Sequence, residues 1–193
     1  MESERNPGAT LKDMFQLTRR HMPSIEMVRL LDMVVFHVLT CNTDAHAKNY
    51  SIMIRGNGVS LSPMYDVMCG EVWGSITKNH AQKIAGESRG DCLKRKHWLR
   101  FAQDCGLNPS QVLERVGTMA KAAMAEAQVA ASEVAAMPAG SHAVVEQARQ
   151  AVERRAQVVF ARLQELEDEP EDQKEAFAFR AIDTTSCNSG PTH

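Results

Sequence analysis

The most regular hydrophobic pattern in the chain lies between Ile25 and about Leu39. Its apolar residues recur at steps of three and four positions, which is the spacing of one face of an α-helix. The residues that define this stripe are Val28, Leu31, Val35 and Val38. Other apolar residues widen the stripe, so the pattern predicts a largely buried helix. Pro23-Ser24 precedes it, and a small polar residue ahead of an apolar run is typical of a helix start.

Helices are also predicted in the second half of the chain. Lys94–Cys105 has apolar residues near helical spacing, and Gly106 directly after it suits a helix C-cap. Pro109-Ser110 starts another helix, and the alanine-rich stretch Ala120–Ala136 is helical by propensity. We interpret the alanine-rich stretch as an antiparallel helix of the same bundle, with a thin core because its side chains are small.

The helical pattern stops at Pro138-Ala-Gly140, and Ser141 is expected to open a last helix that runs to about Leu166. Beyond it the chain is acidic and then small and polar, which predicts disorder. We therefore divide the chain into a polar lead (1–22), one helical domain (23–166) and a disordered acidic and polar tail (167–193). The lead contains a short amphipathic segment, and nothing in the chain repeats at a fixed period.

Shorter elements separate the helical regions. Thr40–Asn49 is polar, with many side chains that can bond the backbone, and predicts a loop. Tyr50–Ile54 and Val59–Leu61 are β-favouring runs separated by Gly56-Asn57-Gly58, where a positive φ costs little, so they predict a hairpin. Residues 70–90 are expected to be loop with a short helix. The predicted fold class is mainly α (α+β), a helical bundle with one short β-hairpin.

Composition narrows the function classes. The 193 residues are 44% hydrophobic and 24% charged, with a net charge of −2, so the whole chain has no general attraction to nucleic acid or to an anionic membrane. We interpret the basic run Lys94-Arg95-Lys96 as a solvated helix start rather than a phosphate contact. No direct nucleic-acid binding and no membrane association are predicted.

Cysteines and the N-terminal sequence indicate a cellular compartment. The five cysteines are scattered and form no C-x-x-C pair, which favours reduced thiols over a disulfide framework or a zinc site. The N-terminal residues are polar and contain no apolar core of a signal peptide. The longest apolar stretch, Val28 to Thr40, includes charged residues and is shorter than a membrane span. We expect a cytoplasmic protein.

The segment with the clearest chemistry is Asn42–Asn49 together with Asp66. Phosphoryl transfer needs a carboxylate to orient the attacking hydroxyl, and oxygen ligands to hold Mg²⁺ against the phosphates. Kinase catalytic loops meet this need with a D-x-x-x-x-N spacing, followed by a metal-binding Asp beyond a short hairpin. Asp44 and Asn49 have this spacing, and Asp66 follows the predicted hairpin. An alternative remains open, in which these residues only form a polar loop with Asx-turns.

The amino-acid sequences of these motifs resemble those of a known family. Thr-Asp-Ala-His-Ala-Lys-Asn-Tyr-Ser and Leu-Ser-Pro-Met-Tyr-Asp are similar to the N-x-D-x-H-x-K-N-x-S and L-x-P-x-Y-D signatures of HipA-type serine/threonine kinases. The likeness continues through Gln82–Glu87 and through Lys96–Leu107, which resembles the family's R-H-W-x-R-F-A-x-x-x-G-L. It covers roughly residues 25–115 and is vague afterwards. The resemblance implies the C-terminal lobe of a protein-kinase-like fold.

The resemblance also implies roles for individual residues. Asp44 would be the catalytic base, Asn49 and Asp66 would be Mg²⁺ ligands, and His46 and Lys48 would support the loop. For His46 we favour a structural role, in which it bonds the loop backbone. The implied cofactors are ATP and Mg²⁺. Known members of the family are toxins of toxin–antitoxin modules, so the implied partners are a protein substrate of the aminoacyl-tRNA synthetase class and a DNA-binding antitoxin.

Part of the kinase pattern is missing from the sequence. A kinase also needs a glycine-rich phosphate loop and a strand lysine, yet only 43 residues precede Asp44 and they contain a single lysine, Lys12. We expect a C-lobe piece, a truncated gene product or one subunit of a split kinase, which binds ATP poorly alone and needs a separate N-lobe. Two other hypotheses are a catalytically inactive module that docks an antitoxin or substrate, and a marginally folded pseudogene product.

Overall fold

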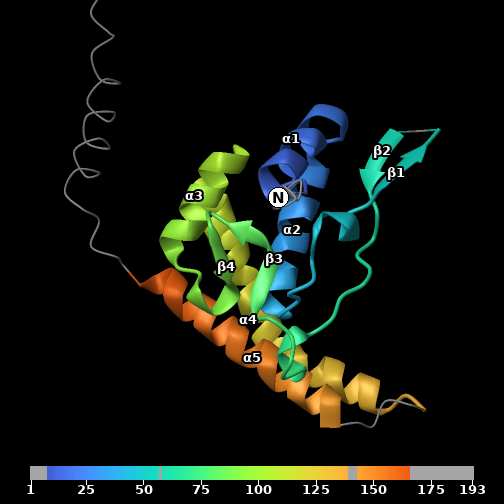
Figure 1. The fold of residues 1–193 in the computed structure, drawn as a ribbon, viewed down its shortest axis with the longest axis vertical. Coiled ribbons are helices and arrows are strands. Elements are labelled where there is room, and N and C mark those ends of the chain that lie inside the picture. The colour runs from blue at the N-terminus through green and yellow to red at the C-terminus, as the bar shows by residue number, and fades with distance from the viewer. Residues whose placement is uncertain (1–7, 57, 139–142, 166–193) are drawn as a thin grey trace, which may run out of the picture.

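The computed structural model describes residues 8–56, 58–138 and 143–165. Five α-helices and two separate two-stranded hairpins make up this part of the chain (Figure 1). The helices are α1 (Leu11–His21), α2 (Ile25–Leu39), α3 (Arg95–Cys105), α4 (Pro109–Ala135) and α5 (Ala143–Gln164). The strands are β1 (Ile52–Arg55), β2 (Gly58–Leu61), β3 (Asn79–Ile84) and β4 (Glu87–Arg89). Single 3₁₀ turns lie at Ala47–Asn49, Gly70–Val72 and Gly90–Cys92. The predicted mainly α class is confirmed.

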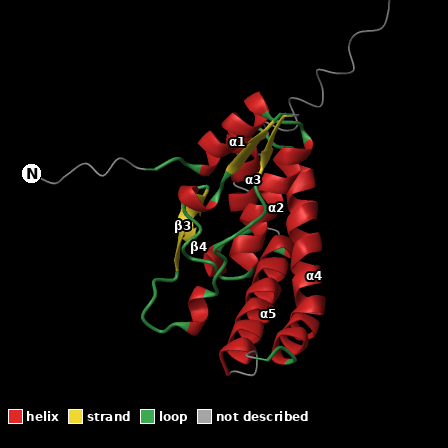
Figure 2. Ribbon diagram, turned by 90° about the vertical axis from the view of Figure 1, so that its right-hand side faces the viewer, coloured by secondary structure: helices red, strands yellow, loops and turns green. Residues whose placement is uncertain are grey.

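Helix α2 lies at the centre of the core. It packs against α1, α4, α5 and strand β2, while α4 and α5 run side by side as a long antiparallel hairpin (Figure 2). The largest completely buried side chains come from every layer of this bundle: Phe15, Leu30, Val35, Leu39, Trp98, Val112, Val116 and Val159. Trp98 and Phe101 are therefore core residues, as predicted, and their rings meet edge to face at 6.1 Å.

The helix predictions from hydrophobic periodicity are confirmed. Helix α2 has the predicted bounds, and α3 ends at Gly106, whose φ of +64° is the left-handed conformation that glycine adopts most easily. The proline-started and alanine-rich segments form one continuous helix, α4, capped by the Asn108 side chain. The last helix also exists, but its predicted start at Ser141 and its end at Leu166 lie outside the described residues.

Helix α1 shows that residues 11–21 of the predicted polar lead pack in the helical bundle. Thr10 and Asp13 form a reciprocal capping box at its start. Leu11 and Phe15 are buried, and the Phe15 ring packs against Phe101 of α3. The proposed boundary after residue 22 therefore does not coincide with a change in packing. The proposed tail, residues 167–193, lies outside the described residues.

The two hairpins differ in how well their sequences predict them. The first is confirmed, because β1 pairs antiparallel with β2 from Ile52–Leu61 to Arg55–Gly58. For residues 70–90 the prediction of loop with a short helix is wrong in its second half, where β3 and β4 pair. Their turn places Ala85 and Gly86 at positive φ, as a tight hairpin turn requires. The strands were missed because Asn79–Ile84 is mostly polar and has few β-branched residues.

Candidate functional site

The site is built around the loop that follows α2, residues 40–51, here named the candidate loop. The chain leaves the helix through Cys41, which has a φ of +56°. The carbonyls of the last helical turn are bonded by the loop itself, since Thr40 donates to Phe36 O and Asn42 donates to His37 O. These bonds satisfy carbonyl groups that a helix end otherwise leaves open. They also fix the direction in which the loop starts.

Asn49 joins the other two residues of the predicted constellation. Its side chain is buried, and its amide nitrogen donates to the Asp44 carbonyl oxygen at 3.1 Å and to Asp66 Oδ2 at 3.3 Å. The Asn49 amide and the Asp66 carboxylate thus lie in contact, although the β1–β2 hairpin separates them in sequence. Because the nitrogen makes both bonds, the amide oxygen of Asn49 is the atom left to bind a cation.

Asp44 and Asp66 both present their carboxylates to solvent. The Asp44 side chain is 60% exposed, so a second molecule can reach it. Asp66 is exposed as well, and its backbone has a φ of +55°, an uncommon conformation for a residue other than glycine. Such conformations cost about 1–3 kcal/mol and gather at functional sites. Here the Asn42 and Asn49 side chains bond Asp66 and stabilise the conformation.

The two supporting residues occupy different surroundings. His46 Nε2 lies 3.9 Å from Asp44 Oδ1, and His46 Nδ1 is buried without a hydrogen-bond partner among the described residues. The prediction that the His46 ring bonds the loop backbone is therefore wrong. Lys48 has an exposed side chain, and its backbone carbonyl accepts a 2.6 Å bond from the Tyr65 hydroxyl. The same hydroxyl contacts Ser51 Oγ at 2.6 Å. Tyr65 therefore ties the end of the candidate loop to the segment that carries Asp66.

Asn42 is a residue of this site that the sequence analysis quoted in the motif but gave no role. It is completely buried, and its Oδ1 accepts the Asp44 backbone N–H at 3.1 Å. Since that bond fixes the oxygen, Nδ2 is the donor toward His37 Nδ1 at 3.1 Å and toward the Asp66 carbonyl at 3.4 Å. One side chain thus contacts both aspartate segments. The sequence signal that points to Asn42 is its position in the motif, two residues before Asp44.

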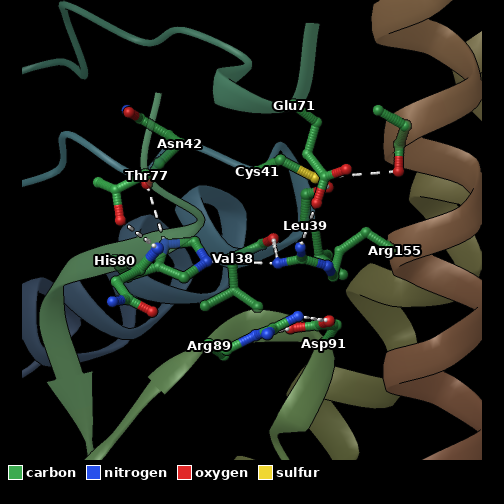
Figure 3. Close-up of polar contacts among 12 residues, drawn as sticks. Val38, Leu39, Cys41, Asn42, Glu71, Thr77, His80, Arg89, Asp91 and Arg155 are labelled. Carbon is green, nitrogen blue, oxygen red and sulfur yellow. Dashed lines mark hydrogen bonds and ion pairs between the residues drawn. The ribbon is translucent and has the colours of Figure 1, made fainter. Parts of the chain in front are cut away.

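A second group of residues comes from distant parts of the sequence (Figure 3). His80 of β3 places Nδ1 3.0 Å from the Asn42 carbonyl oxygen. Arg155 of α5 is 5% exposed, lies 3.3 Å from His80 Nε2, and pairs with Glu71 at 2.9 Å. Strand β3 also donates the Ala81 N–H to the Thr43 carbonyl of the loop at 3.0 Å. No motif marked these residues, because their proximity depends on how α5 and β3 pack.

Burial sets the protonation state of the histidines beneath the loop. Burial lowers the pKa of His80 to about 4, with the nearby Arg155 charge as a second cause. Burial alone lowers the pKa of His37 to about 4. Both imidazoles are therefore neutral at pH 7, and each nitrogen acts as either a donor or an acceptor according to the tautomer.

The donor set of the site fits a hard divalent cation. Mg²⁺ prefers carboxylate and amide oxygens and keeps several waters, so few protein ligands are needed. Asn49 and Asp66 offer one of each within a single hydrogen bond of one another. Within residues 8–56, 58–138 and 143–165, no three or more His, Cys, Asp or Glu side chains gather as a metal site.

No helix in that part of the chain is long and apolar enough to cross a membrane.

Comparison with known proteins finds a matching family. Residues 2–127 match the model of the HipA-like C-terminal domain. A Sinorhizobium fredii protein with the name "putative kinase Y4mE" is 30% identical over 111 residues. The serine/threonine-protein kinase toxin HipA of Shewanella oneidensis is 24% identical over 115 residues. These alignments cover 56% and 59% of this chain but only 26% and 27% of the relatives, so the chain spans about a quarter of their length.

A solved structure shares the fold. It is the complex of Shewanella oneidensis HipA with HipB and operator DNA, and its matching chain superposes with a TM-score of 0.72 at 20% sequence identity. The match covers 84% of this chain and 38% of that chain. At this identity the similarity concerns the fold alone. It agrees with the expected kinase-like C-lobe, a helical bundle that carries a short hairpin.

Proposed function

Because the chain belongs to the HipA-like C-terminal domain family, we propose that it is the C-lobe of a serine/threonine protein kinase. In this proposal it transfers phosphate from ATP to a protein hydroxyl with the help of Mg²⁺. The observation that carries the proposal is the contact of Asn49 with both aspartate segments, at 3.1 Å to the Asp44 carbonyl and 3.3 Å to the Asp66 carboxylate. The first bond is to the Asp44 backbone and the second is to the Asp66 side chain, so Asn49 holds together the two segments whose acids a kinase loop needs.

Each residue has a distinct role in the proposed reaction. Asp44, exposed and free to meet a second molecule, would accept the proton of the attacking hydroxyl. Asn49 and Asp66 would hold Mg²⁺, which supplies charge stabilisation at the phosphates when bound. His46 would orient the Asp44 carboxylate from 3.9 Å, and the exposed Lys48 would lie on the side from which phosphate approaches.

The rest of the proposal concerns partners and location. The kinase relatives extend well beyond the region that this chain matches, so we propose that an N-lobe contributes the glycine-rich loop and the lysine. The HipA of the solved complex is bound to HipB and operator DNA, which supports a DNA-binding antitoxin as partner. A substrate of the aminoacyl-tRNA synthetase class and a cytoplasmic location remain predictions from the family resemblance and the composition.

The test is phosphorylation by the chain mixed with an N-lobe polypeptide that contains a glycine-rich loop and a strand lysine. With ATP and Mg²⁺, we expect transfer to a protein serine or threonine. Removal of a general base lowers rates by about 10²–10⁴-fold, so Asp44→Asn should abolish measurable transfer, and so should Asp66→Asn. Asp104→Asn, which removes an exposed carboxylate paired with Arg100 on α3, is the matched control and should keep full activity. Transfer that survives both site substitutions would refute the proposal.

A second candidate function is a catalytically inactive module that docks an antitoxin or a substrate. It is favoured by a group of exposed apolar side chains within a short stretch after the β1–β2 hairpin, which are Met64, Tyr65, Val67, Trp73 and Ile76. Exposed apolar groups close together mark interaction surfaces. If the chain binds its partner unchanged after Asp44→Asn and Asp66→Asn, and no N-lobe polypeptide restores transfer, this second function replaces the first.

A further inference from the structure

Helix α5 contributes a buried arginine side chain, Arg155, to the group of residues beneath the candidate loop. The family model ends at residue 127, so the whole of α5 lies beyond the matched region. Nevertheless Arg155, in the middle of this helix, is only 5% exposed. Arginine is seldom this buried unless it is paired, and the partners here are Glu71 at 2.9 Å and the Val38 carbonyl at 3.4 Å. The Val38 carbonyl belongs to the last turn of α2, the negative end of that helix.

The contact between Arg155 and His80 determines which imidazole nitrogen carries the proton. The Asn42 carbonyl, 3.0 Å from Nδ1, can only accept a hydrogen bond. The Arg155 guanidinium, 3.3 Å from Nε2, can only donate one. These two neighbours are both satisfied only when the ring is neutral, with its proton on Nδ1 and a lone pair on Nε2. His80 therefore donates to Asn42, and Arg155 holds it in that state (Figure 3).

Asn42 transmits this order to the candidate site. Its carbonyl receives the His80 bond, and its side chain bonds the Asp44 N–H and the Asp66 carbonyl. Hydrogen bonds on the backbone and the side chain of Asn42 thus link α5 and β3 to both aspartate segments. Each member is buried or partly buried, so water competes weakly for these bonds.

Gly90 gives Arg155 the space that this arrangement needs. A Cβ atom at position 90 would lie 1.9 Å from an Arg155 guanidinium nitrogen and 2.7 Å from His80 Nε2. Any other residue would push the guanidinium off the imidazole. The backbone at Gly90–Cys92 therefore lies in close contact with both Arg155 and His80. Attaching α5 to the core would not by itself require so close an approach.

We propose that Arg155 is a positioning residue for the candidate site, which it orders through His80 and Asn42. The proposal rests on the proposed function, in which Asn49 and Asp66 hold the metal. In this proposal, α5 lies outside the family-matched region but determines the geometry of the metal-binding residues without contacting them. A purely structural arginine would hold α5 in place and leave the candidate loop unaffected.

The experiment is heteronuclear NMR on the full chain, with Mn²⁺ as a probe for the metal site. Three variants are compared with the wild type: Arg155→Met, Arg155→Lys and the control Val159→Ala, which truncates a buried side chain one turn along the same helix. We record the His80 ring ¹⁵N signals, the side-chain amide signals of Asn42 and Asn49, and Mn²⁺ affinity by electron paramagnetic resonance. Outer-shell substitutions weaken metal binding by about 10–100-fold, so Arg155→Met should fall in the lower part of that range.

We expect Arg155→Met to shift both asparagine amide signals, to raise the pKa of His80 and to weaken Mn²⁺ binding about tenfold. Arg155→Lys, which keeps a donor cation, should restore part of each effect. Val159→Ala should lower the melting temperature but leave the amide signals and Mn²⁺ affinity unchanged. If Arg155→Met leaves the asparagine amides and the His80 tautomer unchanged, or if Val159→Ala reproduces its effects, Arg155 is only a structural residue and the proposal is wrong.

The failure of the proposed function gives a different result. If the wild type binds no Mn²⁺, or if Asp66→Asn does not weaken binding, the metal site is wrong whatever Arg155 does. In that case the His80 and asparagine signals alone decide whether Arg155 orders the candidate loop, because they require no bound metal.

Discussion

The α4–α5 hairpin and the candidate loop are held in place by different kinds of interaction. The hairpin packs small and apolar side chains, such as Ala120, Ala156 and Val159, along two long helices. The candidate loop instead buries Asn42 and Asn49 and bonds them to carbonyls, an N–H group and a carboxylate. Apolar packing is non-directional, whereas each of these hydrogen bonds requires a particular partner at a particular distance.

This difference teaches which region tolerates change. In the hairpin, a lost contact reduces stability in proportion to the area removed, and the neighbours can adjust. In the candidate loop, a lost side chain leaves buried polar groups without partners, and each such group costs about 1–3 kcal/mol. A single substitution should therefore affect the loop more than the hairpin. The following predictions test this contrast from its largest expected effect to its smallest.

Asn42→Ala should cause the largest loss of stability at a single residue. It leaves the Asp44 N–H and His37 Nδ1 without the bonds that Asn42 makes, and opens a small cavity. We expect the free energy of unfolding to fall by about 3 kcal/mol, measured by urea denaturation. Asn108→Ala is the matched control, since it removes an asparagine that only caps α4, and should cost about 1 kcal/mol. Equal losses of unfolding free energy for Asn42→Ala and Asn108→Ala would contradict the expected sensitivity of the candidate loop.

The second prediction is that lowering the pH reduces the free energy of unfolding through His37 and His80, the histidines beneath the candidate loop. The folded-state pKa of His37 and His80 is about 4, below the ordinary value of 6.5, so the unfolded chain takes up protons first as the pH falls. Their contribution to stability is therefore complete above about pH 6.5 and is lost as the pH falls toward 4. At pH 5 each histidine should account for about 2 kcal/mol of lost stability.

Two measurements check this pH dependence. Urea unfolding at a series of pH values between 7.5 and 5 gives the stability curve, and NMR titration gives the pKa of each ring directly. If either histidine titrates near 6.5 in the folded chain, its imidazole is not held neutral by burial. The assigned donor and acceptor roles at Asn42 would then be wrong as well.

Arg115→Met should have the smallest effect. Arg115 of α4 makes two 2.6 Å bonds to Asp32 of α2, a geometry as close as any in the buried network. Its side chain is nevertheless 43% exposed, and exposed ion pairs contribute about 0–1 kcal/mol. We expect a loss of at most about 1 kcal/mol in urea unfolding, and a smaller loss at high salt because screening weakens the pair. A larger loss would show that the hairpin also depends on directional contacts.

Predictions from the sequence were most accurate where one face of an element is apolar. The bounds of α2 and the C-cap Gly106 follow from local pattern, since a helix buries residues at a fixed period. The β3–β4 hairpin was missed because its strands are mostly polar, and tertiary packing decides their conformation. Helix α1 lies in the segment assigned to the polar lead, where the sequence indicates only a short amphipathic stretch, yet its apolar face packs against α3.

For the site, spacing predicted which residues to examine but not what supports them. Asp44, Asn49 and Asp66 were selected from their separations along the chain, and the structure places Asn49 in contact with the other two segments. Their proposed chemical roles remain predictions. His80 and Arg155 could not be selected, because neither belongs to a motif that marks the loop.

The sequence by itself determined helices α2 to α5, the first hairpin and the order of the motif residues, because these depend on interactions between near neighbours in the chain. Tertiary structure decided the rest: that Arg155 enters the floor of the candidate loop, that Gly90 leaves room for it, and that His80 connects it to Asn42. Buried hydrogen bonds need exact mutual placement of groups from distant segments. Only the packed arrangement of α5, β3 and α2 provides that placement.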